Sequence, residues 1–296
     1  MKNDPYREHV LLTLQIESLL KISKGWDHSY RILFLPSFHP EVCVTIQSKS
    51  SNSYLSLTTA QTTLWGYGMY LRHKETWPKE EPPPAPPIFW KETKEIDPAR
   101  IYQFLREMET LQIVDIPDLK VLSLDGMEFQ AESCNALGQY NFFSVDYFPT
   151  ESKQFKFAHE IFALATEILE EPASIRVLEH VYCYLGLGMP IKDLGGNPYI
   201  VRFFGSLSSI YQDELRQLLM RLPDSVPLLM DMSNFDSMGR ILYPLFQGLL
   251  ERRQLTKTAS WTSSIYLKRQ LLEIGISASQ IFDNREDAIR VLTHSE

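Results

Sequence analysis

The sequence predicts an α+β N-terminal region with antiparallel strands, followed by a small α/β domain. Alternate residues from Val42 to Ile46 are branched and apolar, which is the period of a strand with one buried face. Asp125-Gly126 stands between two strand-like runs, and this dipeptide suits a type I′ turn because both central residues need a positive φ. After Pro198, strand-like and helix-like segments alternate, which predicts parallel strands joined by right-handed crossovers.

The N-terminal region is expected to begin with a helix at Pro5, because proline suits the first helical position. Extended segments are predicted at residues 30–35, 42–47, 54–59, 63–72, 121–124, 127–130 and 139–147. Further helices are predicted at residues 97–111, 155–169 and 173–185. This order of elements indicates an antiparallel sheet with helices at its ends.

Residues 79–87 read Lys-Glu-Glu-Pro-Pro-Pro-Ala-Pro-Pro. Proline lacks an amide donor and restricts φ, so this segment is expected to be neither helix nor interior strand. It is interpreted as a polyproline II connector that acts as a stiff spacer. The alternative is a ligand for an aromatic-lined groove.

Four divisions of the chain follow from these patterns. Turn chemistry at Gly195-Gly196-Asn197-Pro198 predicts a boundary there. The expected divisions are an N-terminal helix with antiparallel strands (1–81), the proline-rich connector (82–96), an α+β region with the Asp-Gly hairpin (97–194) and the α/β domain (195–296).

Within the last division, strands are predicted at residues 199–204, 226–230, 256–261 and 281–282. The helices between and after them are predicted at about residues 208–222, 241–250, 264–274 and 285–292. The run 226–230 is apolar throughout, as expected for a strand that is covered on both faces. Residues 231–239 are expected to form a loop.

The order of these segments resembles the STAS domain, the family of bacterial anti-sigma-factor antagonists and of the cytosolic tails of sulfate transporters. The segments that carry the resemblance are 200–205, 228–233, 236–239, 272–276, 281–282 and 286–288. The N-terminal region resembles, through its hairpin, aromatic strand and long helix, small bacterial proteins of unknown function, some of which are immunity proteins. The first resemblance implies a binding module, and the second implies toxin neutralisation.

In antagonists of the STAS family, the loop at a helix start holds an Asp-Ser-Ser-Gly-like motif whose second serine is phosphorylated. Met238 stands at that position here, and a thioether cannot be phosphorylated, so only Ser237 could substitute for it. The candidate partner-binding residues are Asn234, Phe235, Asp236, Ser237 and Met238. Phe235 and Met238 are residue types that anchor interfaces. The alternative is that both pack in the domain core while Asp236 or Ser237 caps the helix.

Composition and charge exclude some function classes. The net charge of −8 argues against a protein that grips nucleic acid, and it fits ordinary solubility or docking on a basic partner. No apolar run approaches the length of a membrane helix, so no membrane insertion is expected. Three widely spaced cysteines and an N-terminus without a secretory pattern predict a cytoplasmic protein.

No pattern in the sequence predicts a catalytic, cofactor or metal site. Glycine-rich phosphate loops and the nucleophile-elbow motif are absent, and the seven histidines are scattered. Strand alternation predicts that Glu128 and Gln130 face solvent, so a solvated edge accounts for the acidic group Asp125, Glu128 and Glu132.

The first functional hypothesis is therefore a non-catalytic, cytosolic, regulatory protein that occludes or sequesters another protein through its STAS-like domain. Its partner would be an anti-sigma-like regulator. The alternative is an immunity protein that binds a cognate bacterial toxin directly. A second alternative is an enzyme that acts at a groove between the two regions.

Overall fold

The computed structural model describes residues 5–50, 52–78, 82–112, 116, 126–146, 149–253 and 257–293, and it divides the chain into two compact units, Met1–Tyr184 and Leu185–Glu296. This division lies ten residues before the boundary that was predicted between residues 194 and 195. The Gly195–Pro198 turn is part of a hairpin inside the second unit, because it joins two paired strands.

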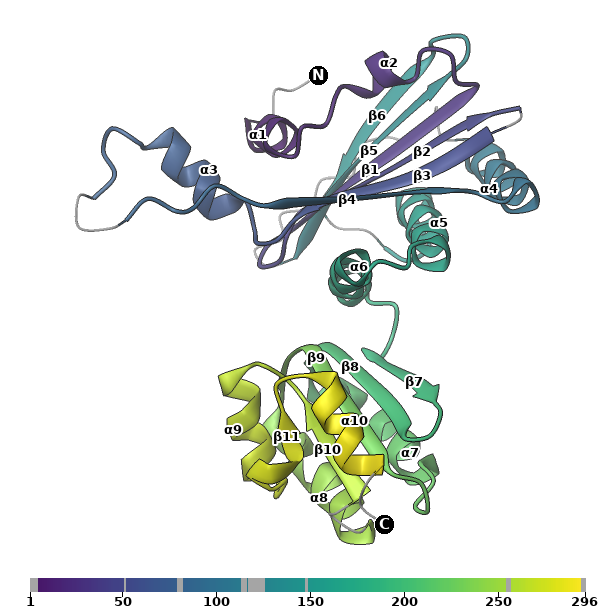
Figure 1. Ribbon diagram of the computed structural model, residues 1–296. Helices are drawn as coiled ribbons and strands as arrows, with labels where there is room; N and C mark the ends of the chain where they lie inside the picture. Colours follow the sequence, from purple (N-terminus) through teal and green to yellow (C-terminus); the bar gives the residue numbers. More distant parts are fainter. Residues whose placement is uncertain are drawn as a thin grey trace. The chain divides into compact units, whose positions relative to one another are not determined.

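The first unit is built on a six-stranded antiparallel sheet (Figure 1). The strand order is β4-β3-β2-β1-β5-β6. The strands are β1 (His28–Pro36), β2 (Val42–Lys49), β3 (Asn52–Ala60), β4 (Phe89–Glu95), β5 (Met127–Asn135) and β6 (Tyr140–Val145). The sheet takes strands from all three predicted N-terminal divisions, so 1–81, 82–96 and 97–194 contribute to one unit.

Helices cover both faces of this sheet (Figure 1). One face carries α1 (Pro5–Thr13) and α2 (Leu19–Ile22), and Val10 of α1 and Leu14, which follows this helix, pack against Leu33 and Leu35 of β1. The other face carries α4 (Pro98–Leu111) and α5 (Lys153–Ile168), whose Phe104 and Phe157 contact Tyr30. The remaining helices are α3 (Trp65–Arg72) and α6 (Pro172–Leu185). The α+β prediction for this region is confirmed.

Two segments differ from the prediction. Residues 63–72 were expected as a strand, but Trp65–Arg72 form helix α3. The Leu64 amide donates to the buried Glu41 carboxylate at 2.9 Å and the Trp65 amide donates to Thr63 Oγ1 at 3.3 Å, so amides that a helix start leaves unpaired are satisfied. The expected connector 82–96 lacks regular structure only over 82–88 and then forms the edge strand β4.

The Asp-Gly hairpin falls partly outside the described residues, because residues 117–125 are not among them. Its second half is β5, which pairs with β1 on one side and with β6 on the other. The predicted solvated edge is therefore wrong for Gln130 and Glu132, which are buried because β5 lies between two neighbours.

Buried charges link α1 to the sheet. Arg31 of β1 and Glu132 of β5 are register partners and form an ion pair at 3.3 Å. Glu132 also pairs with Arg7 of α1 at 2.9 Å and accepts a hydrogen bond from the Tyr140 hydroxyl at 2.7 Å. The Arg7 guanidinium lies over the Phe142 ring. Several donors thus offset the cost of burying the Glu132 carboxylate.

The second unit is a five-stranded sheet in the order β11-β10-β9-β8-β7. The strands are β7 (Ile191–Gly195), β8 (Tyr199–Leu207), β9 (Leu228–Met238), β10 (Thr258–Trp261) and β11 (Ile281–Phe282). β7 pairs antiparallel with β8, and the other neighbours are parallel. The predicted parallel arrangement is confirmed, and β7 is an additional antiparallel edge strand.

Helices of the second unit lie on both faces of its sheet (Figure 1). α7 (Gln212–Arg221), α8 (Tyr243–Arg252) and α9 (Ile265–Glu273) share one core with the inner side chains of β8 and β9. α10 (Arg285–Thr293) packs on the opposite face, where Ala288 and Leu292 meet Leu229 and Ala259. Among the helices of the described residues, none has the length and apolar character to cross a membrane.

Replacing Glu132 by alanine should destabilise the first unit by about 3–5 kcal/mol, because Arg31 would remain buried without its counter-charge. Urea unfolding followed by tryptophan fluorescence measures this change, since every tryptophan except Trp261 lies in the first unit. The exposed Glu107 on α4, replaced by alanine, is the control and should unfold like the wild type. Equal stability of the two variants would contradict a role for the buried pair.

Candidate functional site

The candidate site lies at the carboxyl ends of the parallel strands in the second unit. β8 ends at Leu207 and β9 ends at Met238, and these two residues are register partners. Carboxyl ends of parallel strands meet at the same edge of a sheet, and the segments that follow them form the surface there. The predicted partner-binding residues belong to this edge.

The predicted loop 231–239 is instead the second half of β9. Phe235 and Met238 lie in the core of the unit, where the rings of Phe235 and Phe203 have their centroids 5.8 Å apart. Asn234 is also buried. The expectation of an exposed loop is wrong for these three residues, because pairing with β8 continues to the end of β9 and directs them inward. Packing of Phe235 and Met238 in the core, the alternative considered above, is what the structure shows.

A β-bulge explains why Asp236 differs from its neighbours. Gly205 of β8 pairs with Phe235, but the next residue, Ser206, pairs with Ser237, so Asp236 is an extra residue in β9. Gly205 has φ of 56°, a value that glycine adopts without strain. A bulge re-aims side chains. Asp236 is accordingly exposed and Ser237 half-buried, so these two remain as candidate contact residues.

A glutamine side chain hydrogen-bonds the end of β9 on the side that faces away from β8. β10 pairs with β9 only over Leu228–Asp231, so the last part of β9 has no strand on that side. Gln270 of α9 is buried there, accepts from the Met238 amide at 3.2 Å and donates to the Met238 carbonyl at 3.0 Å. The carboxamide thus satisfies both backbone groups of Met238, as a neighbouring strand would.

Exposed apolar side chains follow the carboxyl ends of the three parallel strands β8, β9 and β10. Each belongs to the first turn of the helical segment that follows β8, β9 or β10. We call them the edge patch: Ile210 (76% exposed), Ile241 (58%), Ile265 (72%) and Tyr266 (58%). Isolated exposed apolar residues are common, but a group at one edge indicates a contact surface. The sequence did not predict the patch, because Ile241 has the helical spacing of the apolar residues Leu245 and Leu249.

Hydrogen bonds connect the polar and apolar parts of this edge. The hydroxyls of Ser206 and Ser237 lie 3.1 Å apart. The Tyr266 hydroxyl accepts a hydrogen bond from Gln270 Nε2 at 3.4 Å. The same Gln270 nitrogen donates to the Met238 carbonyl. In the described part of the unit, neither serine hydroxyl is bonded to a histidine or carboxylate that could activate it as a nucleophile.

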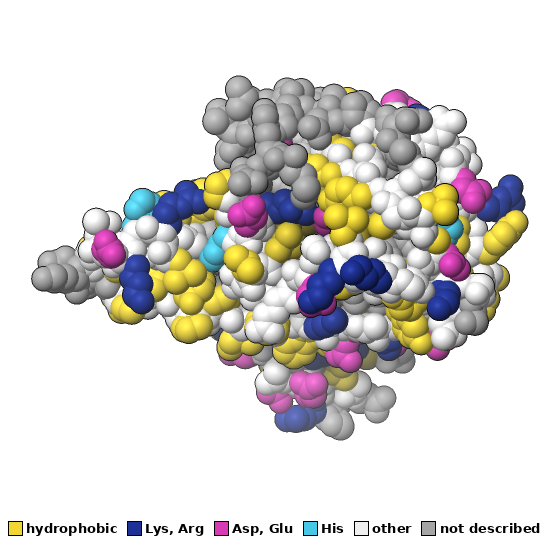
Figure 2. Space-filling view, turned by 90° about the horizontal axis from the view of Figure 1, so that it is seen from above, with side chains coloured by type: hydrophobic (Ala, Val, Ile, Leu, Met, Phe, Trp, Pro, Cys, Tyr) yellow, Lys and Arg dark blue, Asp and Glu magenta, His cyan; other side chains and the backbone are white. Residues whose placement is uncertain are grey.

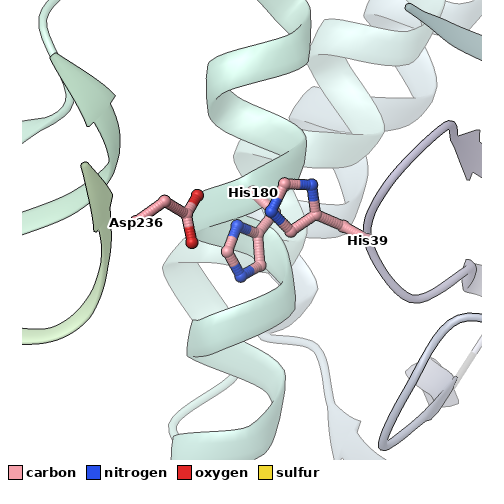
Figure 3. Close-up of side chains that lie close together, drawn as sticks. All are labelled: His39, His180 and Asp236. Carbon is pink, nitrogen blue, oxygen red and sulfur yellow. The ribbon is translucent and has the colours of Figure 1, made fainter. Parts of the chain in front are cut away.

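A pair of histidines in the first unit was not expected from the sequence. The rings of His39 and His180 stack with centroids 3.8 Å apart, and His39 Nδ1 lies 3.0 Å from the Tyr184 hydroxyl (Figure 3). Two imidazoles supply part of the ligand set that a transition metal requires. Within the described residues of the first unit, no third ligand joins them. Asp236, also labelled in Figure 3, belongs to the second unit.

Comparisons with known proteins give a structural likeness for part of the chain. No family model and no curated protein matches the chain. A crystal structure described as a sulfate transporter family protein from Wolinella succinogenes is similar to part of it, with 16% sequence identity and a TM-score of 0.28. The likeness covers 34% of this chain and 86% of that one.

Replacing Gln270 by alanine should free the Met238 amide and speed its hydrogen exchange about tenfold or more, since an unsatisfied buried group costs about 1–3 kcal/mol. Exchange measured on peptides that contain Met238 tests this. The exposed Gln217 on α7, replaced by alanine, is a matched control that should leave the rate unchanged. An unaltered rate in the Gln270 variant would contradict the proposed role of the carboxamide.

Proposed function

We propose that this chain is a non-catalytic, cytosolic protein-binding protein, and that it occludes or sequesters a partner through a STAS-like second unit. The observation that carries the proposal is the edge patch beside Asp236 and Ser237. Interfaces combine an apolar centre with a polar rim, and tyrosine is enriched among residues that dominate binding energy. Tyr266 and the three isoleucines of the edge patch supply such an apolar centre.

Charged groups supply a rim for the same edge. Arg240 precedes Ile241 and lies 3.7 Å from Glu273 of α9, with both side chains largely exposed. Such pairs add little affinity, but they influence orientation and association rate. The order of strands and helices in the second unit supports a STAS-like interpretation, because it follows the order on which the family resemblance was based.

The phosphorylation switch of that family does not carry over. Met238 occupies the position of the modified serine, and its side chain is buried against the core. Ser237 is half-buried and has a hydrogen-bond partner in Ser206. We therefore propose that the edge binds without this switch, and that partner concentration governs how much of the chain is bound.

Replacing Ile241 by aspartate should abolish capture of the partner, because a charge would be buried in the centre of the interface. The test is affinity capture from the source cell, with the bound proteins compared between the variant and the wild type. Leu194 of β7 is 55% exposed and lies beside the start of β8, at the other end of this strand from Ile210, so its aspartate variant is the matched control and should retain the partner.

The identity of the captured protein separates the hypotheses. A regulator that is lost only with the Ile241 variant supports the STAS-like proposal, and a toxin lost in the same way supports the immunity alternative. Equal capture by the wild type, the Ile241 variant and the Leu194 variant would refute the edge patch as the interface.

A further inference from the structure

A cavity of about 500 Å³ lies on the face of the first unit that carries α1. This volume is within the usual range for ligand pockets, about 300–1,000 Å³. α1, the start of α3, the end of β1, the start of β5 and the residue after β6 all contribute to it. The residues that line it are Tyr6, Leu35, Pro36, Ser37, Trp65, Gly126, Met127, Glu128 and Asp146. Figure 2 shows this side of the unit, with hydrophobic and charged side chains interspersed.

Two aromatic rings form one wall of the cavity. Tyr6 of α1 and Trp65 of α3 meet edge to face, with centroids 5.2 Å apart. Buried Glu41 holds both elements, because its carboxylate accepts from the Tyr6 hydroxyl and, at 2.9 Å, from the Leu64 amide. Burial raises the pKa of Glu41, and these hydrogen bonds oppose the shift. The wall is thus positioned before any ligand arrives, which reduces the cost of binding.

Two carboxylates line the same cavity. Glu128 Oε1 accepts from Gln130 Nε2 at 2.7 Å and from Ser144 Oγ at 2.9 Å, so its side chain is oriented by neighbours on β5 and β6. Asp146 follows β6 directly. Among the described lining residues there is no lysine, arginine or histidine. The smaller neighbouring cavity differs, because it includes His9 and Arg72 and no carboxylate among its described lining.

We propose that the larger cavity binds a guanidinium group carried on an apolar stem. Carboxylates pair with the planar guanidinium through charge-assisted hydrogen bonds, and aromatic faces attract it through cation–π contact. Leu35, Pro36 and Met127 provide apolar surface for the stem. The net charge of −8 assists the approach of such a cation. The group comes from an arginine side chain of a protein segment or from a free small guanidine.

The test titrates the full-length chain with Ac-Gly-Arg-Gly-NH₂, with agmatine, and with the citrulline analogue of the peptide. Tryptophan fluorescence reports occupancy through Trp65, which lines the cavity. The arginine peptide or agmatine should bind saturably, and the neutral citrulline peptide should bind at least tenfold more weakly. Tighter binding of the peptide than of agmatine assigns the site to a protein segment, and the reverse order assigns it to a small guanidine.

Matched variants show whether binding uses this cavity. Glu128→Gln and Asp146→Asn should each weaken binding about tenfold, with Glu107→Gln on α4 as the control that leaves affinity unchanged. Thermal unfolding of each variant confirms that it is folded, and Ile241→Asp should bind the probes like the wild type because it lies in the other unit. Equal binding of the citrulline peptide, no saturable binding by either cation, or full affinity in both acidic-residue variants would overturn the proposal.

Discussion

The second unit depends on hydrogen bonds that complete β9 where its shorter neighbour β10 has ended. β10 pairs with β9 only as far as Asp231, so the backbone beyond that residue needs other partners on one side. Gln270 supplies them at Met238, and an unpaired backbone group at this depth would be costly. Because α9 is held to the end of β9 in this way, the helix start with Tyr266 lies beside the strand ends. The contact surface is therefore a consequence of how β9 is completed.

A comparable constraint operates in the first unit, where a charged residue lies in the middle of a sheet. Glu132 is buried on β5, and Arg31 of β1 and Arg7 of α1 stabilise it together with the Tyr140 hydroxyl. α1 is thereby held on one face of the sheet, and this position brings Tyr6 over Glu41. The aromatic wall of the cavity thus depends on buried charge pairing, since the helix that carries Tyr6 is anchored by it.

The two surfaces differ in the chemistry that they offer. The edge patch is apolar with a mixed-charge rim, and it suits burial against another protein. The cavity is aromatic and acidic, and it suits a single cationic group. The net negative charge of the chain favours encounter with a cationic group, whereas apolar contacts determine how long a complex lasts.

The sequence by itself determined most helices and strands, because these follow from local periodicity and capping. Asp97, Ser152 and Ser264 each accept a hydrogen bond from the first turn of the helix that they precede. Only the tertiary structure decided which side chains are exposed at the site. The bulge that turns Asp236 outward depends on register with β8, and the burial of Met238 depends on α9. Such long-range pairing leaves no local periodicity, so sequence patterns could not predict it.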